Sequence, residues 1–182
     1  MGIFNKKKKE NEIEMQKLTK KELAEALNQM ALNEMDYFDG FFKTNNIAFD
    51  FNYFVSSVFS YYFSVWYVFL MKNNSIDTCQ GIKKIYMDAL IFLLSNACQR
   101  DHVDKVVYIN HFEENIEKAI NEAKNSIEEN SFVDKGFTDM FLESFLNNND
   151  ILRIDKSNVT LRIMETWVYP VIKIINKTII TD

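Results

Sequence analysis

Residues 47–71, IAFDFNYFVSSVFSYYFSVWYVFLM, decide how this chain folds. They hold 11 of its 26 aromatic residues (16 Phe, 8 Tyr and 2 Trp), and positions 51–71 contain no charge, Gly or Pro. A run of 21 residues is too long for an ordinary strand, whereas as a helix it would extend about 32 Å. The run therefore predicts a helix over residues 50–72, with Asp50 or Asn52 as its N-cap and Lys72 near its negative C-terminal end.

The predicted helix is apolar on nearly every side. A period of 3.6 residues places most of its hydroxyl groups on one face, formed by Tyr53, Ser56, Ser57, Ser60, Ser64 and Tyr67. Such a helix is either the centre of a soluble bundle or a membrane span over residues 51–71. The serines, Tyr61 and Tyr62 would put hydroxyls where lipid offers no partner, so the soluble bundle is favoured and the span stays an alternative.

The overall composition favours long helices. Only four Gly and one Pro are present among 182 residues, which leaves few of the tight turns that many-stranded folds need. A hydrophobic content of 47% at this length supports one substantial core. We expect an all-α, single-domain bundle of about five to seven helices over residues 15–182, centred on residues 50–72. A flexible basic tail, which includes four consecutive lysines, is expected over residues 1–14.

Two capping boxes mark further helix starts. Thr19 with Glu22 predicts a helix that ends near Gly40, because glycine suits the left-handed position after a helix. Asn110 with Glu113 predicts the start of the most clearly amphipathic helix of the chain. Before that start, residues 106–109 suggest an extra helical turn.

The remaining segments also suggest helices. One is expected over residues 77–98, with Phe92 in its buried stripe, and another from Ser131 to about residue 146. Residues 151–163 alternate as a hairpin would, but the C-terminal segment also has a helical stripe of Val159, Ile163, Trp167, Val171, Ile174 and Thr178. We favour a helix from about Val159, kinked at Pro170.

Charge and cysteine content restrict the partners and the compartment. The net charge is −5 and lysines are concentrated before residue 22, so the body is acidic and nucleic-acid binding is unlikely. Cys79 and Cys98 would lie about 28 Å apart on one continuous helix, which excludes a direct disulfide between them. Without a secretory signal pattern, two buried thiols in a reducing cytoplasm are the favoured interpretation.

The sequence contains no recognisable catalytic pattern. It has no Gly-rich phosphate loop, and neither cysteine has a glycine framework that would pair it with His102 as a nucleophile. His111, Glu114 and Glu117 fall on one side of a helix, but a carboxylate-bridged metal site needs matching sets from other helices. We therefore expect no metal, no cofactor and no enzymatic activity.

The favoured function is protein–protein interaction. We expect a non-enzymatic cytosolic protein, such as a subunit of a larger bacterial assembly or an immunity-type inhibitor. The candidate partner-binding surface is acidic, because a charged helix surface can steer a basic partner; it comprises Glu113, Glu114, Glu117 and Glu122.

Two alternatives concern the aromatic helix. Its hydroxyl face either lines a pocket for an apolar small molecule or forms a close seam with a neighbouring helix. In addition, an all-round apolar helix needs more covering surfaces than four other helices are expected to supply. That shortage predicts a homodimer or a stable hetero-complex.

Overall fold

The computed structural model describes residues 16–101, 104–130, 135–175 and 177–181. These residues form helices, apart from one short pair of strands, so the predicted all-α fold is confirmed. In chain order the elements are β1 (Gln16–Thr19), α1 (Lys20–Thr44), α2 (Phe51–Asn73), α3 (Ile76–Asp101), α4 (Lys105–Asn130), α5 (Lys135–Glu143), α6 (Asn148–Ile151), α7 (Lys156–Ile163), η1 (Met164–Val168), α8 (Tyr169–Ile175) and β2 (Thr178–Thr181). The predicted tail at residues 1–14 and the predicted start at Ser131 lie outside the described residues.

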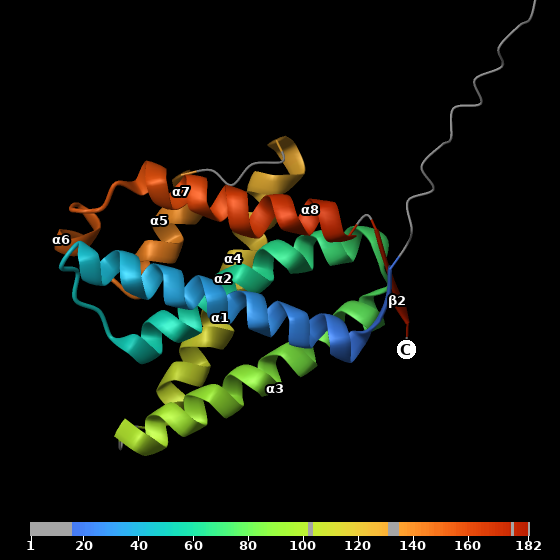
Figure 1. Cartoon of the computed structure of the whole chain (residues 1–182), viewed down its shortest axis with the longest axis horizontal. Coiled ribbons are helices and arrows are strands. Elements are labelled where there is room, and N and C mark those ends of the chain that lie inside the picture. Colours follow the sequence, from blue (N-terminus) through green and yellow to red (C-terminus); the bar gives the residue numbers. More distant parts are fainter. Residues whose placement is uncertain (1–15, 102–103, 131–134, 176, 182) are drawn as a thin grey trace, which may run out of the picture.

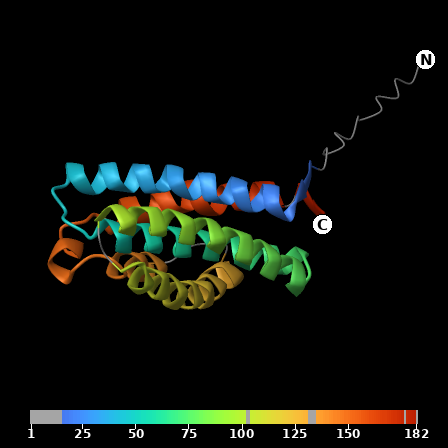
Figure 2. The same ribbon diagram turned by 90° about the horizontal axis from the view of Figure 1, so that it is seen from below.

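Helix α2 is the centre of the bundle. It contacts α1, α3, α4, α5, η1 and α8. Figures 1 and 2 show α1 and the α7–α8 rod on one side of α2, with α4 on the other. Of its 23 residues, 17 are buried. The chain itself therefore covers α2, and the expected shortage of covering surfaces is wrong.

The same helix has the length and composition of a membrane span. In its most apolar window of 18 residues, 89% of the residues are buried inside the fold. A core helix and a membrane span share these sequence properties, because both are long and free of charge. The burial agrees with the core-helix interpretation that the serines favour.

Two of the predicted N-caps are confirmed. The Glu22 amide donates to Thr19 Oγ1 (3.2 Å) and the Thr19 amide donates to Glu22 Oε2 (2.8 Å), which completes the capping box of α1. Asp50 Oδ1 accepts hydrogen bonds from the amides of Asn52 (2.9 Å) and Tyr53 (3.1 Å), so Asp50 caps α2.

The predicted end of α1 at Gly40 is wrong. Gly40 does not have a positive φ, and α1 continues to Thr44. The extension keeps Phe42 in the core, where its ring lies 5.4 to 6.0 Å from those of Phe38, Phe49, Phe54 and Phe145. Such packing outweighs the local preference of one glycine.

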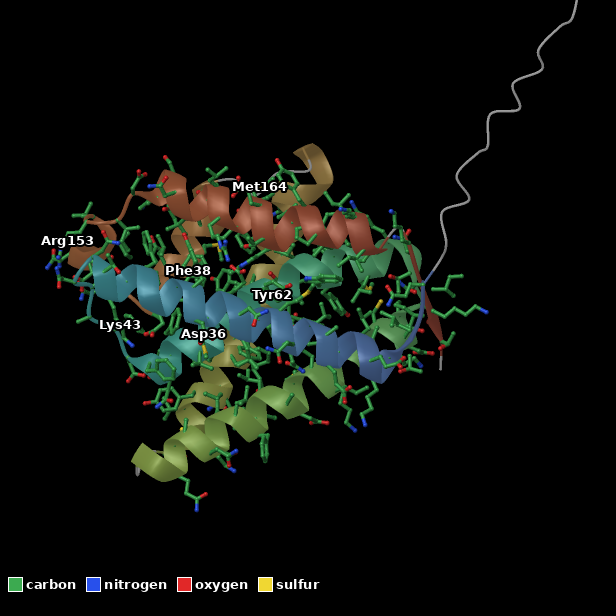
Figure 3. The ribbon with its side chains drawn as sticks, viewed as in Figure 1. Asp36, Phe38, Lys43, Tyr62, Arg153 and Met164 are labelled. Atoms are coloured by element: carbon green, nitrogen blue, oxygen red, sulfur yellow. The ribbon has the colours of Figure 1, made fainter. Side chains whose placement is uncertain are left out.

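The chain leaves α1 through a left-handed residue of a different type. Asn46 has φ 53°, a conformation that asparagine tolerates better than most residues. At this end of the bundle Arg153, labelled in Figure 3, donates from Nη2 to the Asn45 carbonyl at 3.2 Å. That bond ties the connection after α6 to the end of α1.

The start predicted for the amphipathic helix is also wrong. Helix α4 begins at Lys105, so Asn110 lies inside the helix and is not a cap. Asp104 Oδ1 accepts the Val106 amide at 2.9 Å and takes the capping role. The apolar residues 106–109 are therefore the first turn of α4 itself.

Helix α3 covers another side of α2. Tyr86 is buried, stacks on Phe63 with ring centroids 4.5 Å apart, and donates its hydroxyl to the Phe59 carbonyl at 3.0 Å. Cys79 and Cys98 are both buried, and no disulfide joins them, as predicted. Phe92, expected in the buried stripe, is 67% exposed.

The C-terminal segment is helical, and the hairpin alternative is wrong. Helix α7 starts before Val159, at Lys156, and Asp155 Oδ1 accepts the Ser157 amide at 3.0 Å. It passes through the π-helical turn η1 into α8. Pro170 lacks an amide hydrogen, and its ring would clash with the carbonyl of Thr166 in a regular helix. A widened turn just before the proline removes that conflict, so η1 stands where a kink was predicted.

Strands β1 and β2 are a feature that the sequence analysis missed. They pair in parallel, with Gln16 opposite Thr178 and Thr19 opposite Thr181. Thr178, expected on the helical stripe, is the first residue of β2. The β2 sequence TIIT consists only of β-branched residues, which suit extended structure.

Candidate functional site

The outer side of α4 carries the predicted acidic residues. Three of them are exposed and are called the acidic face below: Glu113, Glu114 and Glu117. The fourth, Glu122, is half-buried and lies at the edge of this face. The face is not purely acidic, because Lys83 of α3 donates to Glu117 Oε1 at 2.8 Å. Glu113 and Glu114 form no ion pair described in the structure, so they are its more available charges.

The same side of α4 begins with apolar residues. Val106 is 50% exposed and Val107 is 48% exposed. Helical spacing puts Val106 on the same side of α4 as positions 110, 113 and 117, and Val107 on the same side as position 114. The two valines therefore precede the acidic face on one surface. The outer side of α4 therefore joins an apolar start to an acidic continuation.

The inner side of α4 holds that surface rigidly. It buries Phe112, Ile116, Ala119, Ile120 and Ala123. At its first turns, Tyr53 of α2 makes edge-to-face ring contacts with α4, at 4.9 Å to Tyr108 and 4.7 Å to His111. Packing on α2 thus determines which side of α4 carries the exposed glutamates.

The hydroxyl face of α2 has the geometry of a helix seam. Ser56, Ser57, Ser60 and Ser64 are completely buried. Each donates its hydroxyl to a backbone carbonyl about one turn earlier, at distances from 2.7 to 3.1 Å. These bonds satisfy the serines within α2 itself, which leaves no spare donor for a ligand.

The two tyrosines of this face lie closer to the surface. Tyr53 is half-buried among the α4 rings. The Tyr67 hydroxyl accepts a hydrogen bond from Gln80 Nε2 of α3 at 3.0 Å. The two tyrosines therefore contact different neighbours, Tyr53 the helix α4 and Tyr67 the helix α3.

His111 connects α4 to the serine seam. Its Nε2 lies 3.2 Å from Ser57 Oγ and 2.8 Å from Asn115 Nδ2. Burial lowers the pKa of His111, and the nearby Glu114 carboxylate opposes that effect. In the described part of the chain, no group of three or more His, Cys, Asp or Glu side chains is placed to hold a metal ion. His102 lies outside the described residues.

The lowered pKa of His111 predicts a pH dependence of stability. A folded-state pKa below the unfolded value of about 6.5 means that the unfolded chain binds the proton more readily. Stability should therefore be highest above pH 6.5 and fall as the pH drops below it. Urea unfolding at pH 7.5 and pH 5.5 should show a smaller loss of stability in the variant His111→Gln, because this variant lacks the titrating imidazole. His102 is present in both proteins and contributes equally to each. An equal loss in the two proteins would contradict this role.

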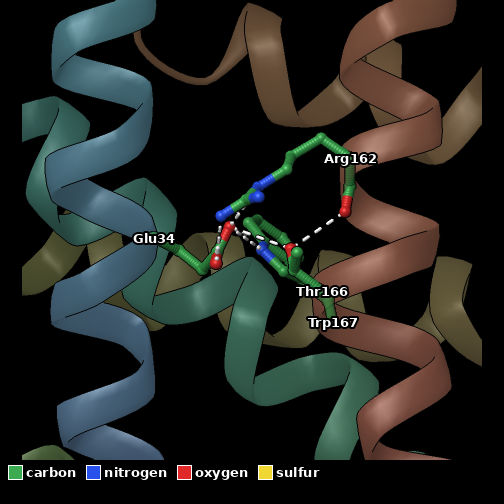
Figure 4. A network of polar contacts seen from close by, with 4 residues as sticks. All are labelled: Glu34, Arg162, Thr166 and Trp167. Atoms are coloured by element: carbon green, nitrogen blue, oxygen red, sulfur yellow. Dashed lines mark hydrogen bonds and ion pairs between the residues drawn. The ribbon is translucent and has the colours of Figure 1, made fainter.

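A buried carboxylate forms the best-connected polar cluster of the fold (Figure 4). Glu34 of α1 is only 6% exposed. Arg162 of α7 donates to it from Nε (3.1 Å) and Nη2 (2.8 Å), and the Trp167 indole donates at 3.1 Å. The Thr166 hydroxyl lies 2.9 Å both from Glu34 Oε2 and from the Arg162 carbonyl. Arg162 also stacks on Tyr37, 3.8 Å from the ring centroid.

Glu34 is not among the predicted residues, although its place in the sequence carries a signal. Glu34 follows Ala31 by three residues and precedes Phe38 by four, so it falls on the buried stripe of α1. A charged residue on such a stripe requires a partner. Its partners saturate the carboxylate, and the cluster therefore joins α1 to α7 and η1 as a structural connection.

Asn52, the alternative N-cap predicted for α2, is not the cap but lies in the first turn of the helix. Its side chain is 6% exposed, and Oδ1 has no hydrogen-bond partner among the described residues. Burial raises the pKa of Tyr108, and a hydrogen bond from Asn52 opposes that rise. The Tyr108 hydroxyl itself donates to Asp50 Oδ2 at 3.4 Å.

Asn52 lines an apolar slot between α1, α2 and α3. The apolar residues around it include Leu32 and Met35 of α1, Val55 of α2, and Leu93 and Leu94 of α3.

No family model, curated protein or solved structure matches this chain. Its function therefore has to be argued from its own residues.

Proposed function

We propose that this protein is a non-enzymatic cytosolic binding protein that docks a basic protein partner on the outer side of α4. A subunit of a bacterial assembly and an immunity-type inhibitor both work in this way. The observation that carries the proposal is the adjacency of exposed Val106 and Val107 to the acidic face on one rigid helix.

The two parts of this surface have different roles in binding. Apolar side chains at the start of α4 supply area that is removed from water when the partner docks. Glu113 and Glu114 attract a basic surface over about 10 Å at moderate salt, which speeds the encounter more than it strengthens the complex. A basic partner with an apolar patch beside its charges fits both parts.

The other proposals of the sequence analysis have lost support to different degrees. A small-molecule pocket at the serines is disfavoured, because their hydroxyls are used within α2. Self-association lacks its original reason, since α2 is covered by its own chain. A second copy is also a poor partner for the acidic face, because like charges would meet there.

The proposal predicts a specific change in association kinetics. The partner is first recovered from host extract with a photo-crosslinking residue at the exposed position Asn110. In the variant Glu113→Lys with Glu114→Lys, the association rate at low salt should then fall about tenfold, with little change at high salt. Val107→Ser should instead raise the dissociation rate. Stopped-flow mixing at two salt concentrations measures both effects.

The matched control reverses two exposed carboxylates elsewhere, with Asp36→Lys on α1 and Asp88→Lys on α3. It makes the same change in net charge and leaves α4 intact. If the control slows association as much as the α4 variant does, only the total charge matters and the acidic face is not the site. Crosslinking that recovers only further copies of this chain would replace the proposal with self-association.

A further inference from the structure

A groove of about 490 Å³ follows η1 and α8 where they lie beside β1. Its base is apolar and partly open to water. Tyr169 is 52% exposed, and Pro170 and Ile174 are half-buried. Apolar side chains gathered in an open groove mark a binding surface. Figures 1 and 2 show α8 and α4 on opposite sides of α2, so the groove is independent of the function proposed above.

The rim of the groove is charged in a defined order. Lys173 and Lys177 are exposed and lie toward β2, whereas Glu165 is exposed at the opposite end. None of these three side chains forms an ion pair with a described residue. An occupant that complements the groove therefore carries carboxylates at one end, a cation at the other and apolar side chains between the rims.

The segment that precedes β1 has this pattern. Residues 10–16 read ENEIEMQ, and residues 6–9, further from β1, are four lysines. Carboxylates at positions 10, 12 and 14 alternate with Ile13 and Met15. Successive side chains of an extended chain point to opposite sides. In that conformation the carboxylates would point to one side and the two apolar side chains to the other.

The segment also begins at the right place and has the right length. The Gln16 amide donates to the Lys177 carbonyl at 2.8 Å, and Gln16 is part of the groove lining. The chain before Gln16 therefore starts from the Lys177 end of the groove. The helical rise from Glu165 to Lys177 is about 18 Å, and six extended residues reach about 20 Å.

We propose that residues 10–15 of this same chain lie extended in the groove. The apolar side chains at positions 13 and 15 cover its base, and the carboxylates at positions 12 and 14 pair with the two rim lysines. Lys9, next along the chain, reaches Glu165. Because the segment is continuous with β1, contacts too weak to hold a free peptide are sufficient. The flexible tail expected over residues 1–14 is then limited to the residues before Lys9.

The first test changes only the segment. Nitrogen-15 relaxation of the full chain should give residues 12–14 order parameters of about 0.85, the value of rigid backbone. Ile13→Asp should lower them below about 0.6 and shift the methyl resonances of Ile174, because a carboxylate cannot replace the apolar contact. The matched control is Ile3→Asp, which makes the same change outside residues 10–15 and should leave both measurements unchanged.

The second test locates the segment by exchanging charges. Lys173→Glu with Lys177→Glu should lower the same order parameters, and so should Glu12→Lys with Glu14→Lys. All four changes together should restore them, since opposite charges then meet again in exchanged positions.

The matched control for the rim reverses two exposed lysines elsewhere, with Lys84→Glu on α3 and Lys118→Glu on α4. It should leave the order of residues 12–14 unchanged.

Three results would overturn the proposal. The first is an order parameter below about 0.6 at residues 12–14 of the wild type. The second is an exchange of all four charges that does not restore the order lost in the two pairs. The third is order that appears only as light scattering shows a dimer forming, which would place the segment of a second copy in the groove.

Discussion

Replacing Glu34 by alanine is expected to lower the free energy of unfolding by about 3 kcal/mol. The carboxylate accepts two hydrogen bonds from Arg162 and one from the Trp167 indole, and Trp167 is fully buried. Without Glu34 the indole N–H keeps no acceptor, and the guanidinium loses its only described carboxylate. The loss is moderated because the Arg162 side chain is 27% exposed and can turn toward water, and the Thr166 hydroxyl can use the Arg162 carbonyl.

The matched control is Asp36→Ala, two residues further along α1, where the side chain is exposed (Figure 3). It removes the same charge type from the same helix and should change stability by no more than about 0.5 kcal/mol. Equilibrium urea unfolding compares the two variants, provided that their denaturant slopes agree. Equal stabilities of Glu34→Ala and Asp36→Ala would show that the cluster contributes little.

Replacing Ser60 by leucine is expected to destabilise the fold by about 2 to 3 kcal/mol. Ser60 is completely buried and lies one turn after Ser57, which contacts His111 of α4. A leucine would replace the hydroxyl by a branched carbon with two methyl groups where α2 is completely buried. The expected result is either strain in the side chains or separation of α4 from α2.

Ser60→Ala is the matched control, because it also removes the hydroxyl and adds no volume. The Ser60 hydroxyl donates only to the Ser57 carbonyl of its own helix, so the alanine variant should stay within about 1 kcal/mol of the wild type. Thermal and urea unfolding of both variants measure the difference. A leucine variant as stable as the alanine variant would reveal free space beside Ser60 and reopen the pocket interpretation.

Residue types along the chain predict which elements exist better than where they end. Helix α2 is predictable because its segment is long and uncharged, and a helix is the structure that can bury such a segment in a core. The end of α1 is not predictable from Gly40, because a glycine reports only a local backbone preference. Phe42, beyond it, is kept in the helix by ring contacts with Phe54 of α2 and with Phe49 and Phe145. Periodicity alone puts Phe92 in the core, but no other element of the described chain covers that side of α3, and the side chain is exposed to solvent.

The candidate sites were predictable to different extents. Exposed glutamates on α4 could be predicted, because the opposite stripe of that helix is strongly apolar. Glu34 could have been noticed as a charge on a buried stripe, but its partner Arg162 is 128 residues away. The burial of the Asn52 side chain, with Oδ1 lacking a partner among the described residues, follows from the packing of α2 and could be seen only in the three-dimensional structure.

The parallel pair of β1 and β2 has a consequence for the order of folding. Thr181 Oγ1 donates to the Leu18 carbonyl across a sequence separation of 163 residues. Helix pairs close short loops, whereas this pair closes a loop that contains every helix of the described chain. Such a contact has a high entropic cost until the bundle has brought its ends together. We therefore expect the strands to pair after the bundle has formed, so that they stabilise an arrangement of helices that already exists.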